Sequence, residues 1–323
     1  MQTMRHRAEH GAALPDPDQE LRAKSLDDVP DGLSRPQKAI AGKHLWDEAG
    51  STLFDRICAS PGYYPTRRET DLLRREAAAI ARLVGPDATL VEFGSGASHK
   101  TRILLDALQA PRRYVAIDIS GEFLGAACAR IAADYPGIEV VPLCADYSRA
   151  VDLPSRPDGG PLLGFCPGLS MGNLTPGAMV DCLARARESL APGWFLLTGD
   201  GTRDAAELHH AYADPDGLMA AFHLNVLARL TRELDTDFDP AAFRHEARVL
   251  DHPFRVEAHL VAHRDAAFRL SGRRIAFAEG ESIHTDTSFK YGPDELAALA
   301  TRAGWQPVRA WTSGAVCLQL LRS

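Results

Sequence analysis

Residues 89–101 read Thr-Leu-Val-Glu-Phe-Gly-Ser-Gly-Ala-Ser-His-Lys-Thr, and this stretch decides the fold of the chain. Its first five residues are mostly apolar and predict a short strand, with Glu92 near the end. Gly94 and Gly96 form a turn in which the backbone can approach a ligand closely. From Lys100 onward, apolar residues recur at helical spacing, and the start of that helix presents unpaired N–H groups to an anion. Strand, Gly-x-Gly turn and helix together predict a nucleotide-cofactor fold.

The glycine pattern distinguishes between two kinds of cofactor. A dinucleotide site normally continues as Gly-x-Gly-x-x-Gly, because the third glycine lets helix and strand pack tightly around a pyrophosphate. Here the third position is His99, so that fingerprint is incomplete. S-adenosylmethionine (SAM) has no phosphate but carries an ammonium, a carboxylate, a sulfonium and an adenosine, and Glu92 beside the glycines suits those groups better. The turn therefore favours SAM, with another nucleotide fold as the alternative.

The two strands expected next each end in an acid. The run 113–118 is rich in strand-forming residues and ends at Asp118, about 20 residues after the glycines, where a carboxylate that grips a ribose belongs. Residues 137–147 predict a third strand that ends at Asp146, placed to meet an adenine amino group, with Tyr147 beside the ring. The alternative is that these acids only cap the helices that follow.

The remaining strands complete a particular sheet. Runs at 162–169 and 194–199 supply the fourth and fifth strands. The chain then closes with a helix at 293–303 and two strands at 306–312 and 316–321, joined by a Ser-Gly turn. A closing antiparallel hairpin is typical of the seven-stranded methyltransferase sheet and absent from ordinary dehydrogenase domains. We therefore predict an α/β fold with that Rossmann-like sheet.

The length and spacing of the elements predict two domains. Residues 1–20 are polar and rich in Pro and Asp, so we expect a disordered tail. Prolines around Tyr63 and Tyr64 predict a non-helical corner, followed by a helix over 69–84. A long insertion separates the fifth and sixth strands: it is helical over 203–232 and then strand-like at 254–263, 267–270 and 274–277. We assign residues 68–202 and 288–323 to the cofactor domain, and residues 31–67 and 203–287 to an α+β domain that covers the carboxyl edge of the sheet.

Composition excludes several classes of function. The net charge of −7 and the absence of a basic stripe argue against nucleic-acid binding. Acidic residues interleave the arginines at 67–75, which predicts an ordinary solvated helix face there. No signal peptide or apolar run of membrane-spanning length is present, and the six cysteines are scattered without a metal-binding or disulfide pattern. We expect a cytoplasmic monomer that binds no metal, membrane or nucleic acid.

Several motifs appear in order from about residue 38 to the end of the chain. They include Trp46-Asp-Glu-Ala-Gly-Ser51, Tyr63-Tyr-Pro-Thr-Arg67, Glu92-Phe-Gly-Ser-Gly96, Met171-Gly-Asn-Leu-Thr-Pro176 and Phe289-Lys290. The Tyr-Tyr-Pro-Thr-Arg and Gly-Asn-Leu-Thr-Pro elements are the specific ones. With these motifs the chain resembles the histidine Nα-trimethyltransferase family of ergothioneine biosynthesis, which uses SAM to make the betaine hercynine. The resemblance implies a class I methyltransferase domain with an added domain that binds an amino acid.

The resemblance also implies roles for individual residues. The α-carboxylate of the substrate would lie against Asn173 and Tyr212, with Tyr63 nearby and Gly168 near the amino group. A neutral amide and a phenol can donate to a carboxylate without adding a charge beside the sulfonium. The imidazole would be read by an acceptor carboxylate and a donor hydroxyl, at Asp286 and Ser288. SAM would be held by Glu92, Gly94, Gly96, Lys100, Asp118, Asp146 and Tyr147.

Three positions depart from the family pattern, all in the expected substrate pocket. Trp46 replaces a tyrosine, Asp286 replaces a glutamate and is one methylene shorter, and Ala258 stands where the family has a methionine. His259 is a candidate to fill the space beside Ala258. These changes leave α-N-methylation of a larger aromatic amino acid as the alternative to histidine. A catalytically silent SAM-binding regulator is the alternative from another class.

The expected chemistry is an in-line transfer of a methyl group to a neutral α-amine. Desolvation and aligned acceptors would lower the pKa of the amine, and proximity would supply much of the rate, because the sequence shows no strong general base. Purely structural roles stay open for four of the residues. Tyr63 could pack a corner, and Asn173 could cap a helix or satisfy a turn. Asp286 could lie in a surface turn, and Trp46 could belong to the core.

Overall fold

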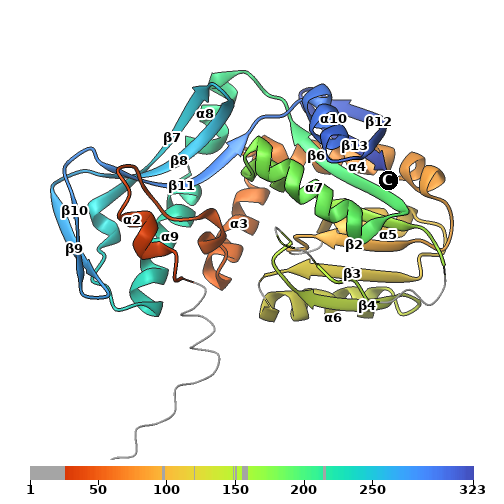
Figure 1. The fold of residues 1–323 in the computed structure, drawn as a ribbon, viewed down its shortest axis with the longest axis horizontal. Coiled ribbons are helices and arrows are strands. Elements are labelled where there is room, and N and C mark those ends of the chain that lie inside the picture. The colour runs from red at the N-terminus through yellow and green to blue at the C-terminus, as the bar shows by residue number, and fades with distance from the viewer. Residues whose placement is uncertain are drawn as a thin grey trace, which may run out of the picture.

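The computed structural model places the chain in two lobes, which lie side by side in Figure 1. The larger lobe comprises residues 64–200 and 293–322, and the smaller lobe residues 29–59 and 205–289. The residues described are 26–96, 99–119, 121–147, 149, 151–154, 159–213 and 216–323. The expected tail at 1–20 lies outside them.

The larger lobe contains a seven-stranded sheet, counted over the described residues, in the order β12-β13-β6-β5-β2-β3-β4. The strands from β6 to β4 are parallel, and β13 is antiparallel to both of its neighbours, β6 and β12. The strands are β2 (Thr89–Phe93), β3 (Arg113–Asp118), β4 (Glu139–Cys144), β5 (Leu162–Cys166), β6 (Gly193–Asp200), β12 (Gln306–Ser313) and β13 (Val316–Arg322). This confirms the predicted class I methyltransferase sheet and its closing antiparallel hairpin.

Helices cover both faces of this sheet, because successive side chains of each strand point to opposite faces. Leu90 of β2 packs in a core with residues of α4, α5 and α6, whereas its neighbour Val91 packs in a second core with α7 and α10. The helices are α4 (Tyr64–Val84), α5 (His99–Ala107), α6 (Gly121–Asp134), α7 (Pro176–Leu190) and α10 (Pro293–Arg302). α5 and α10 lie where the sequence predicts helices, and α4 includes the helix expected over 69–84, whereas α7 was not predicted.

The start of α4 differs from the prediction. The helix begins at Tyr64, not at residue 69, so Tyr64 and Pro65 are already helical and the expected non-helical corner ends at Tyr63. Pro65 lies in the first turn of the helix. A proline costs little there, because the N–H it lacks would have no partner within the helix. The residues Thr66 to Arg68 are therefore helical.

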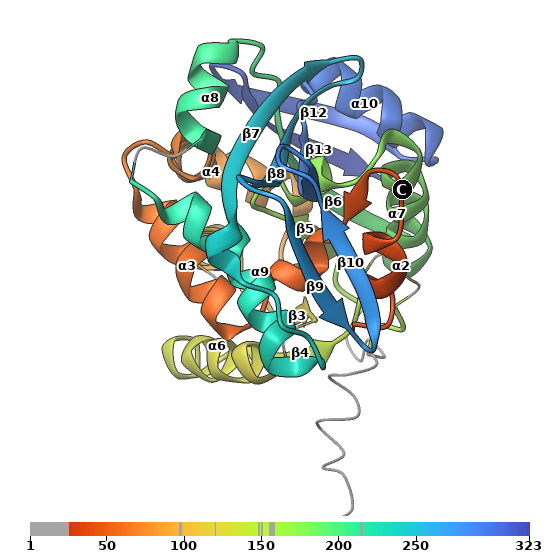
Figure 2. The ribbon, with the colours of Figure 1, turned by 90° about the vertical axis from the view of Figure 1, so that its left-hand side faces the viewer.

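The smaller lobe contains a four-stranded sheet in the order β1-β11-β8-β7 and the hairpin β9–β10, which faces the viewer in Figure 2. These strands are β1 (Lys38–Ala39), β7 (Phe243–Asp251), β8 (Phe254–Ala262), β9 (Ala266–Leu270), β10 (Arg273–Phe277) and β11 (Ser282–Phe289). The helical segments are α2 (Val29–Leu33), η1 (Gly42–Leu45), α3 (Glu48–Ala59), α8 (Ala205–Ala213), α9 (Leu218–Glu233) and η3 (Pro240–Ala242). β8, β9 and β10 match the expected strands, whereas β1, β7 and β11 were not expected.

The motif at residues 46–51 forms the start of α3. The Asp47 carboxylate accepts a hydrogen bond from the backbone N–H of Gly50 at 2.7 Å and caps the helix. Two side chains of α9 hold the same carboxylate, Asn225 at 2.7 Å and Arg232 at 2.5 Å. A Cβ atom on Gly50 would lie 1.8 Å from the carbonyl oxygen of Leu45, so only glycine fits.

Replacing Gly50 by alanine is expected to lower the free energy of unfolding by about 3 kcal/mol, because the methyl group displaces a backbone carbonyl. Gly177 is the matched control, since it also lies in a first helical turn and a Cβ atom there meets nothing within 4 Å. Gly177→Ala should leave stability unchanged or raise it by up to about 1 kcal/mol. Urea unfolding of both variants measures the difference, and equal midpoints would contradict the prediction.

Candidate active site

The Gly-Ser-Gly turn after β2 lies at the carboxyl edge of the large sheet. Gly94 has φ +78° and Gly96 has φ +47°, the left-handed region that favours glycine. The N–H of Gly96 donates to Oδ2 of Asp118 at 3.1 Å, so the acid at the end of β3 holds the turn in place. The buried hydroxyl of Ser95, between the glycines, has no hydrogen-bond partner among the described residues. This orphaned hydroxyl offers a polar group to a ligand, and a Cβ atom on Gly96 would meet nothing of the described chain within 4 Å, which leaves room beside the turn.

Tyr147 covers the same turn from the end of β4. Its ring would lie 3.4 Å from a Cβ atom on Gly94, and it packs edge-on against Phe93 with ring centroids 6.2 Å apart. Asp146, the residue before it, lies 3.8 Å from the guanidinium of Arg149. Glycine backbone, carboxylates and an aromatic ring therefore meet at one edge. This set fits the adenosine and amino-acid parts of SAM, with Asp118, Asp146 and Tyr147 as the residues that would hold the adenosine.

Glu92 is buried and has local partners. Its Oε2 accepts hydrogen bonds from Thr101 of α5, at 2.6 Å, and from the Tyr114 hydroxyl of β3. Burial raises the pKa of Glu92 to about 7, and the two hydroxyl donors partly oppose this. The carboxyl group therefore joins β2, β3 and α5 beneath the glycine turn.

Glu69 is a residue of this site that the sequence pattern did not reveal. It was expected on a solvated helix face, but it is fully buried, so that expectation is wrong at this position. One carboxylate oxygen accepts from the Lys100 ammonium at 2.5 Å, and the other accepts from the backbone N–H of Gly168 at 2.7 Å. Glu69 therefore joins the start of α5 to the loop after β5, two segments with predicted roles toward SAM and the substrate amine.

The loop after β5 has an unusual backbone. Gly168 has φ +78° and Leu169 has φ +59°, and the N–H of Leu169 donates to the Thr198 hydroxyl at 3.0 Å. The short helix η2 (Ser170–Asn173) follows, and a Cβ atom on its Gly172 would lie 2.9 Å from the carbonyl oxygen of Phe289 in β11. The loop is thus fixed to both lobes.

Asn173 is exposed at the end of η2, and its side-chain amide makes no hydrogen bond to the described residues. It does not cap α7, because Thr175 does so by accepting from the N–H of Ala178 at 3.3 Å. The helix-cap alternative for Asn173 is therefore wrong. No hydrogen bond within the described residues joins Asn173 to Tyr212, its predicted partner around the substrate carboxylate.

Aromatic side chains form a row from Trp46 to Tyr212. Trp46 packs edge-on against Phe54 and Phe222, with centroids 4.9 and 5.4 Å apart. Tyr63 packs edge-on against Phe54 at 6.1 Å and against Tyr212 at 5.9 Å. Burial, followed by the neighbouring Tyr212, raises the pKa of Tyr63 well above its ordinary value, so its phenol stays protonated. Three predicted substrate residues, Trp46, Tyr63 and Tyr212, therefore share one aromatic row.

A buried ion pair lies next to Tyr212. The Lys290 ammonium donates to Tyr212 at 2.6 Å, to Ser288 at 2.9 Å and to the Asp200 carboxylate at 3.1 Å. Tyr64 donates to the same carboxylate oxygen at 2.7 Å. Neither Asp200 nor Lys290 has a role that the sequence pattern predicts.

Both members of this pair are charged at neutral pH. Burial by itself disfavours the ammonium, but the contacts with Tyr212 and Asp200 outweigh it and raise the pKa of Lys290. Burial likewise disfavours the carboxylate, but Lys290 and the hydrogen bonds from Thr202 and Tyr64 lower the pKa of Asp200. A fixed positive charge therefore lies beneath two predicted substrate-binding hydroxyls.

Asp286 lies in β11, so the surface-turn alternative is wrong. A β-bulge between His284 and Asp286 brings Asp286 opposite Ala258 of β8, and the two side chains share the sheet face that α8 and α9 cover. Without the extra residue, Asp286 would pair with Glu257 on the other face. Burial raises the pKa of Asp286 to about 7, although it accepts from the N–H of Thr287 at 2.9 Å.

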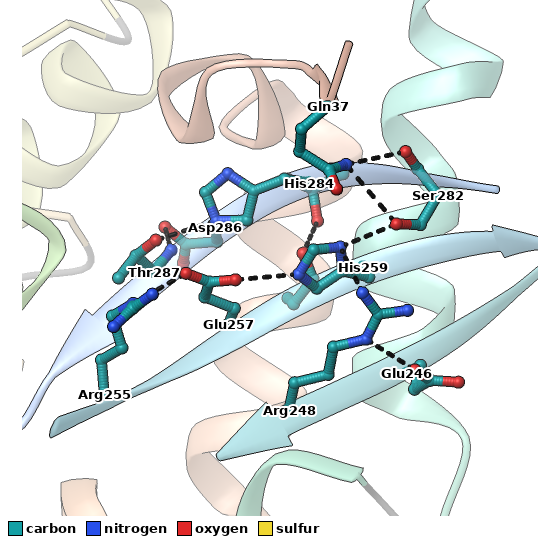
Figure 3. A network of polar contacts seen from close by, with 12 residues as sticks. Gln37, Glu246, Arg248, Arg255, Glu257, His259, Ser282, His284, Asp286 and Thr287 are labelled. Atoms are coloured by element: carbon teal, nitrogen blue, oxygen red, sulfur yellow. Dashed lines mark hydrogen bonds and ion pairs between the residues drawn. The ribbon is translucent and has the colours of Figure 1, made fainter. Parts of the chain in front are cut away.

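His259 does not fill the space beside Ala258. Figure 3 shows its ring in a polar network, between Ser282 at 3.1 Å and Glu257 at 3.0 Å. Its neighbour Arg248 binds Glu246 at 2.6 Å. Because side chains alternate along a strand, this network occupies the face opposite to Ala258 and Asp286. The expectation for His259 is therefore wrong.

Two further findings concern metal binding and membrane spanning. Within the described residues, no group of three or more His, Cys, Asp or Glu side chains is arranged to hold a metal ion. Among those residues, too, no helix combines the length and the apolar character that crossing a membrane requires.

Comparison with known proteins gives a consistent result. Residues 25–322 match the family model described as histidine-specific, SAM-dependent methyltransferases. The histidine N-alpha-methyltransferases of Mycobacterium tuberculosis and Mycolicibacterium smegmatis are each 40% identical to the chain over 294 residues, which is 89% of this chain and 91% of each relative. Ergothioneine biosynthesis protein 1 of Neurospora crassa is 28% identical over 281 residues, or 84% of this chain and 31% of that protein.

The family match covers nearly the whole chain, and the sheet, the Gly-x-Gly turn and the acids at the strand ends agree with it. The resemblance seen in the sequence motifs is thereby confirmed. The chain belongs to the family of SAM-dependent, histidine-specific methyltransferases.

Proposed function

We propose that the chain transfers methyl groups from SAM to the α-amino group of L-histidine until the trimethylated betaine, hercynine, is formed. One observation carries the proposal: the hydroxyls of Tyr212 and Ser288 lie 3.2 Å apart, above the ammonium of Lys290. Tyr212 is the residue expected to read the α-carboxylate, and Ser288 is expected to read the imidazole. The closeness of the two hydroxyls agrees with the short distance between the α-carboxylate and the imidazole within one histidine molecule.

Different residues of this site bind the carboxylate and the side chain of the substrate. Tyr212 and Asn173 donate to the α-carboxylate, and Asp286 and Ser288 pair with the two imidazole nitrogens, one as acceptor and one as donor. Trp46 and Ala258 bound the side-chain site. This assignment is supported by the aromatic row and by the shared face of Asp286 and Ala258.

The chemistry requires an amine with a free lone pair in line with the methyl group. When bound, SAM supplies the electrophilic methyl group on its sulfonium. Tyr63 stays protonated and does not remove the proton from the amine, because its pKa is far above neutral. Loss of water from the amine as it binds beside Gly168 would favour its neutral form, and the loop held by Glu69 would fix its position.

We further assign SAM binding to residues 68–202 and 288–323 and substrate binding to residues 31–67 and 203–287, in a cytoplasmic monomer. Separate buried cores in the two lobes support this division, although β11 continues to Phe289, two residues beyond the boundary at 287. Sedimentation of the purified protein tests the monomer, and a dimer would reject it.

Mass spectrometry of the reaction of histidine and SAM with the purified chain tests the proposed activity. Mono-, di- and trimethylated histidine should appear in succession, with the trimethylated product remaining at the end. Calorimetry of other amino acids with S-adenosylhomocysteine present should show weaker binding than for histidine. Absence of any methylated histidine, with turnover of a larger aromatic amino acid instead, would reject histidine as the substrate.

The activity should fall as the pH decreases through about 7. The raised pKa of Asp286 means that its carboxyl group is neutral below about pH 7 and cannot then accept the imidazole N–H as a carboxylate does. We expect kcat/KM for histidine to decrease from pH 8 to pH 6 more steeply in the wild type than in Asp286→Asn. The variant retains the titration of the substrate itself, so the difference between the two profiles isolates Asp286, and parallel profiles would contradict the prediction.

A further inference from the structure

Lys290 has no access to a ligand, yet it contacts two residues with predicted roles in substrate binding. Its side chain has no exposed surface. All three ammonium hydrogens are used, on Tyr212, Ser288 and Asp200. The ammonium also lies 4.4 Å from the centre of the Tyr212 ring. Any hydrogen bond by which Lys290 influences a substrate must therefore pass through these neighbours.

The hydrogen bonds of Lys290 determine what the two hydroxyls can do. An ammonium only donates, so the oxygens of Tyr212 and Ser288 both act as acceptors toward it. Each hydroxyl has one hydrogen, and the two oxygens are 3.2 Å apart, so at most one of these hydrogens can lie between them. At least one hydroxyl hydrogen is left to be donated to another acceptor, such as a carboxylate or a ring nitrogen.

The position of the ammonium is itself fixed. Asp200 accepts at one oxygen from Lys290 and Tyr64, and at the other from the N–H and the hydroxyl of Thr202, at 3.0 and 2.6 Å. Asp200 ends β6 of the large sheet, whereas Lys290 follows β11 of the smaller sheet. The charge beneath the two hydroxyls is thus held by both lobes and needs no rearrangement when a ligand binds.

We propose that Lys290 is a positioning residue that makes Tyr212 and Ser288 donors and thereby selects substrates with a free α-carboxylate. The proposal rests on the proposed function, in which these hydroxyls face histidine. A neutral side chain in place of Lys290 would leave both hydroxyls able to accept from each other or from an amide. The enzyme would then bind histidine less well and discriminate less between a carboxylate and a carboxamide.

The test compares histidine with histidinamide, which lacks only the carboxylate charge. Calorimetric affinities are measured with S-adenosylhomocysteine present, for the wild type, Lys290→Met, Tyr212→Phe and the double variant. Lys290→Met should lose about tenfold or more of the preference for histidine. When Tyr212 is already phenylalanine, Lys290→Met should reduce the preference for histidine over histidinamide by less than about threefold, because Lys290 acts largely through the Tyr212 hydroxyl. Lys43→Met, at an exposed lysine paired with Asp28, is the control and should match the wild type.

Each result has a defined meaning. The role of Lys290 is overturned if Lys290→Met keeps the wild-type preference for histidine. It is also overturned if Lys290→Met reduces that preference equally with and without the Tyr212 hydroxyl. Because Lys290→Met leaves Asp200 without its cation, Lys290→Met with Asp200→Asn serves where the single variant does not fold, and it should lose the preference in the same way. Failure of the wild type to bind histidine would reject the proposed function instead, and methylation assays separate that outcome.

Discussion

Replacing Glu69 by glutamine is expected to lower kcat/KM about 100-fold and the free energy of unfolding by about 3 kcal/mol. The carboxylate is fully buried and accepts from Lys100 and from the N–H of Gly168 at once. A glutamine has only one acceptor oxygen, so its amide hydrogens face either the Lys100 ammonium or the Gly168 N–H, and one donor is left without a partner. Both the cofactor side and the amine side of the site then shift.

Steady-state kinetics and urea unfolding measure the two effects of Glu69→Gln. Glu76→Gln is the matched control, since it makes the same change on the same helix, near Arg75. It should alter stability by less than about 0.5 kcal/mol and leave the kinetics unchanged. If Glu69→Gln were as stable and active as that control, the bridge between Lys100 and Gly168 would have no role in the site.

Replacing Asn173 by alanine is expected to raise KM for histidine about 10- to 100-fold with almost no loss of stability. The amide is exposed and makes no hydrogen bond within the described residues, so its removal leaves no partner unsatisfied. A hydrogen bond to a charged carboxylate contributes about 1.5–3 kcal/mol, which sets the size of the effect. The unfolding midpoint should change by an amount equivalent to less than about 0.5 kcal/mol.

Kinetics at saturating SAM measure the change in KM for Asn173→Ala. Ser170→Ala controls for disturbance of η2, because the Ser170 hydroxyl only donates to the carbonyl oxygen of Pro167, at 2.9 Å. It should change KM much less than Asn173→Ala does. Equal effects of the two substitutions would show that the shape of the loop matters, and not the amide of Asn173.

The large sheet could be predicted because its signals are local. Each strand is a short apolar run bounded by turn residues, and the Gly-x-Gly turn is contiguous with its strand and helix. β7 and β11 were not expected, because half-buried strands with many charged residues, such as Arg244 and Glu246, do not alternate cleanly. The bulge before Asp286 has no glycine to signal it.

The buried charges could not be found from the order of residues alone. Glu69 lies in a charged run, and its partner Lys100 comes from another helix 31 positions away. A helical signal was nevertheless present, since Leu72 and Leu73 follow at the three- and four-residue spacing that defines one helix face. Asp200 ends β6 as Asp118 ends β3, but its cation, Lys290, lies 90 positions further along the chain.

The alternation of side chains along β8 and β11 places the proposed substrate-binding residues and a polar network on opposite faces of the sheet. Ala258 and Asp286 lie on the face that we propose bounds the substrate, and the network of Glu257 and His259 lies on the opposite face. Changes at positions 258 and 286 can therefore retune which amino acid is accepted while the salt-bridged layer stays intact. For protein engineering, the residues on one face of the smaller sheet can be substituted while the polar network on the other face is kept.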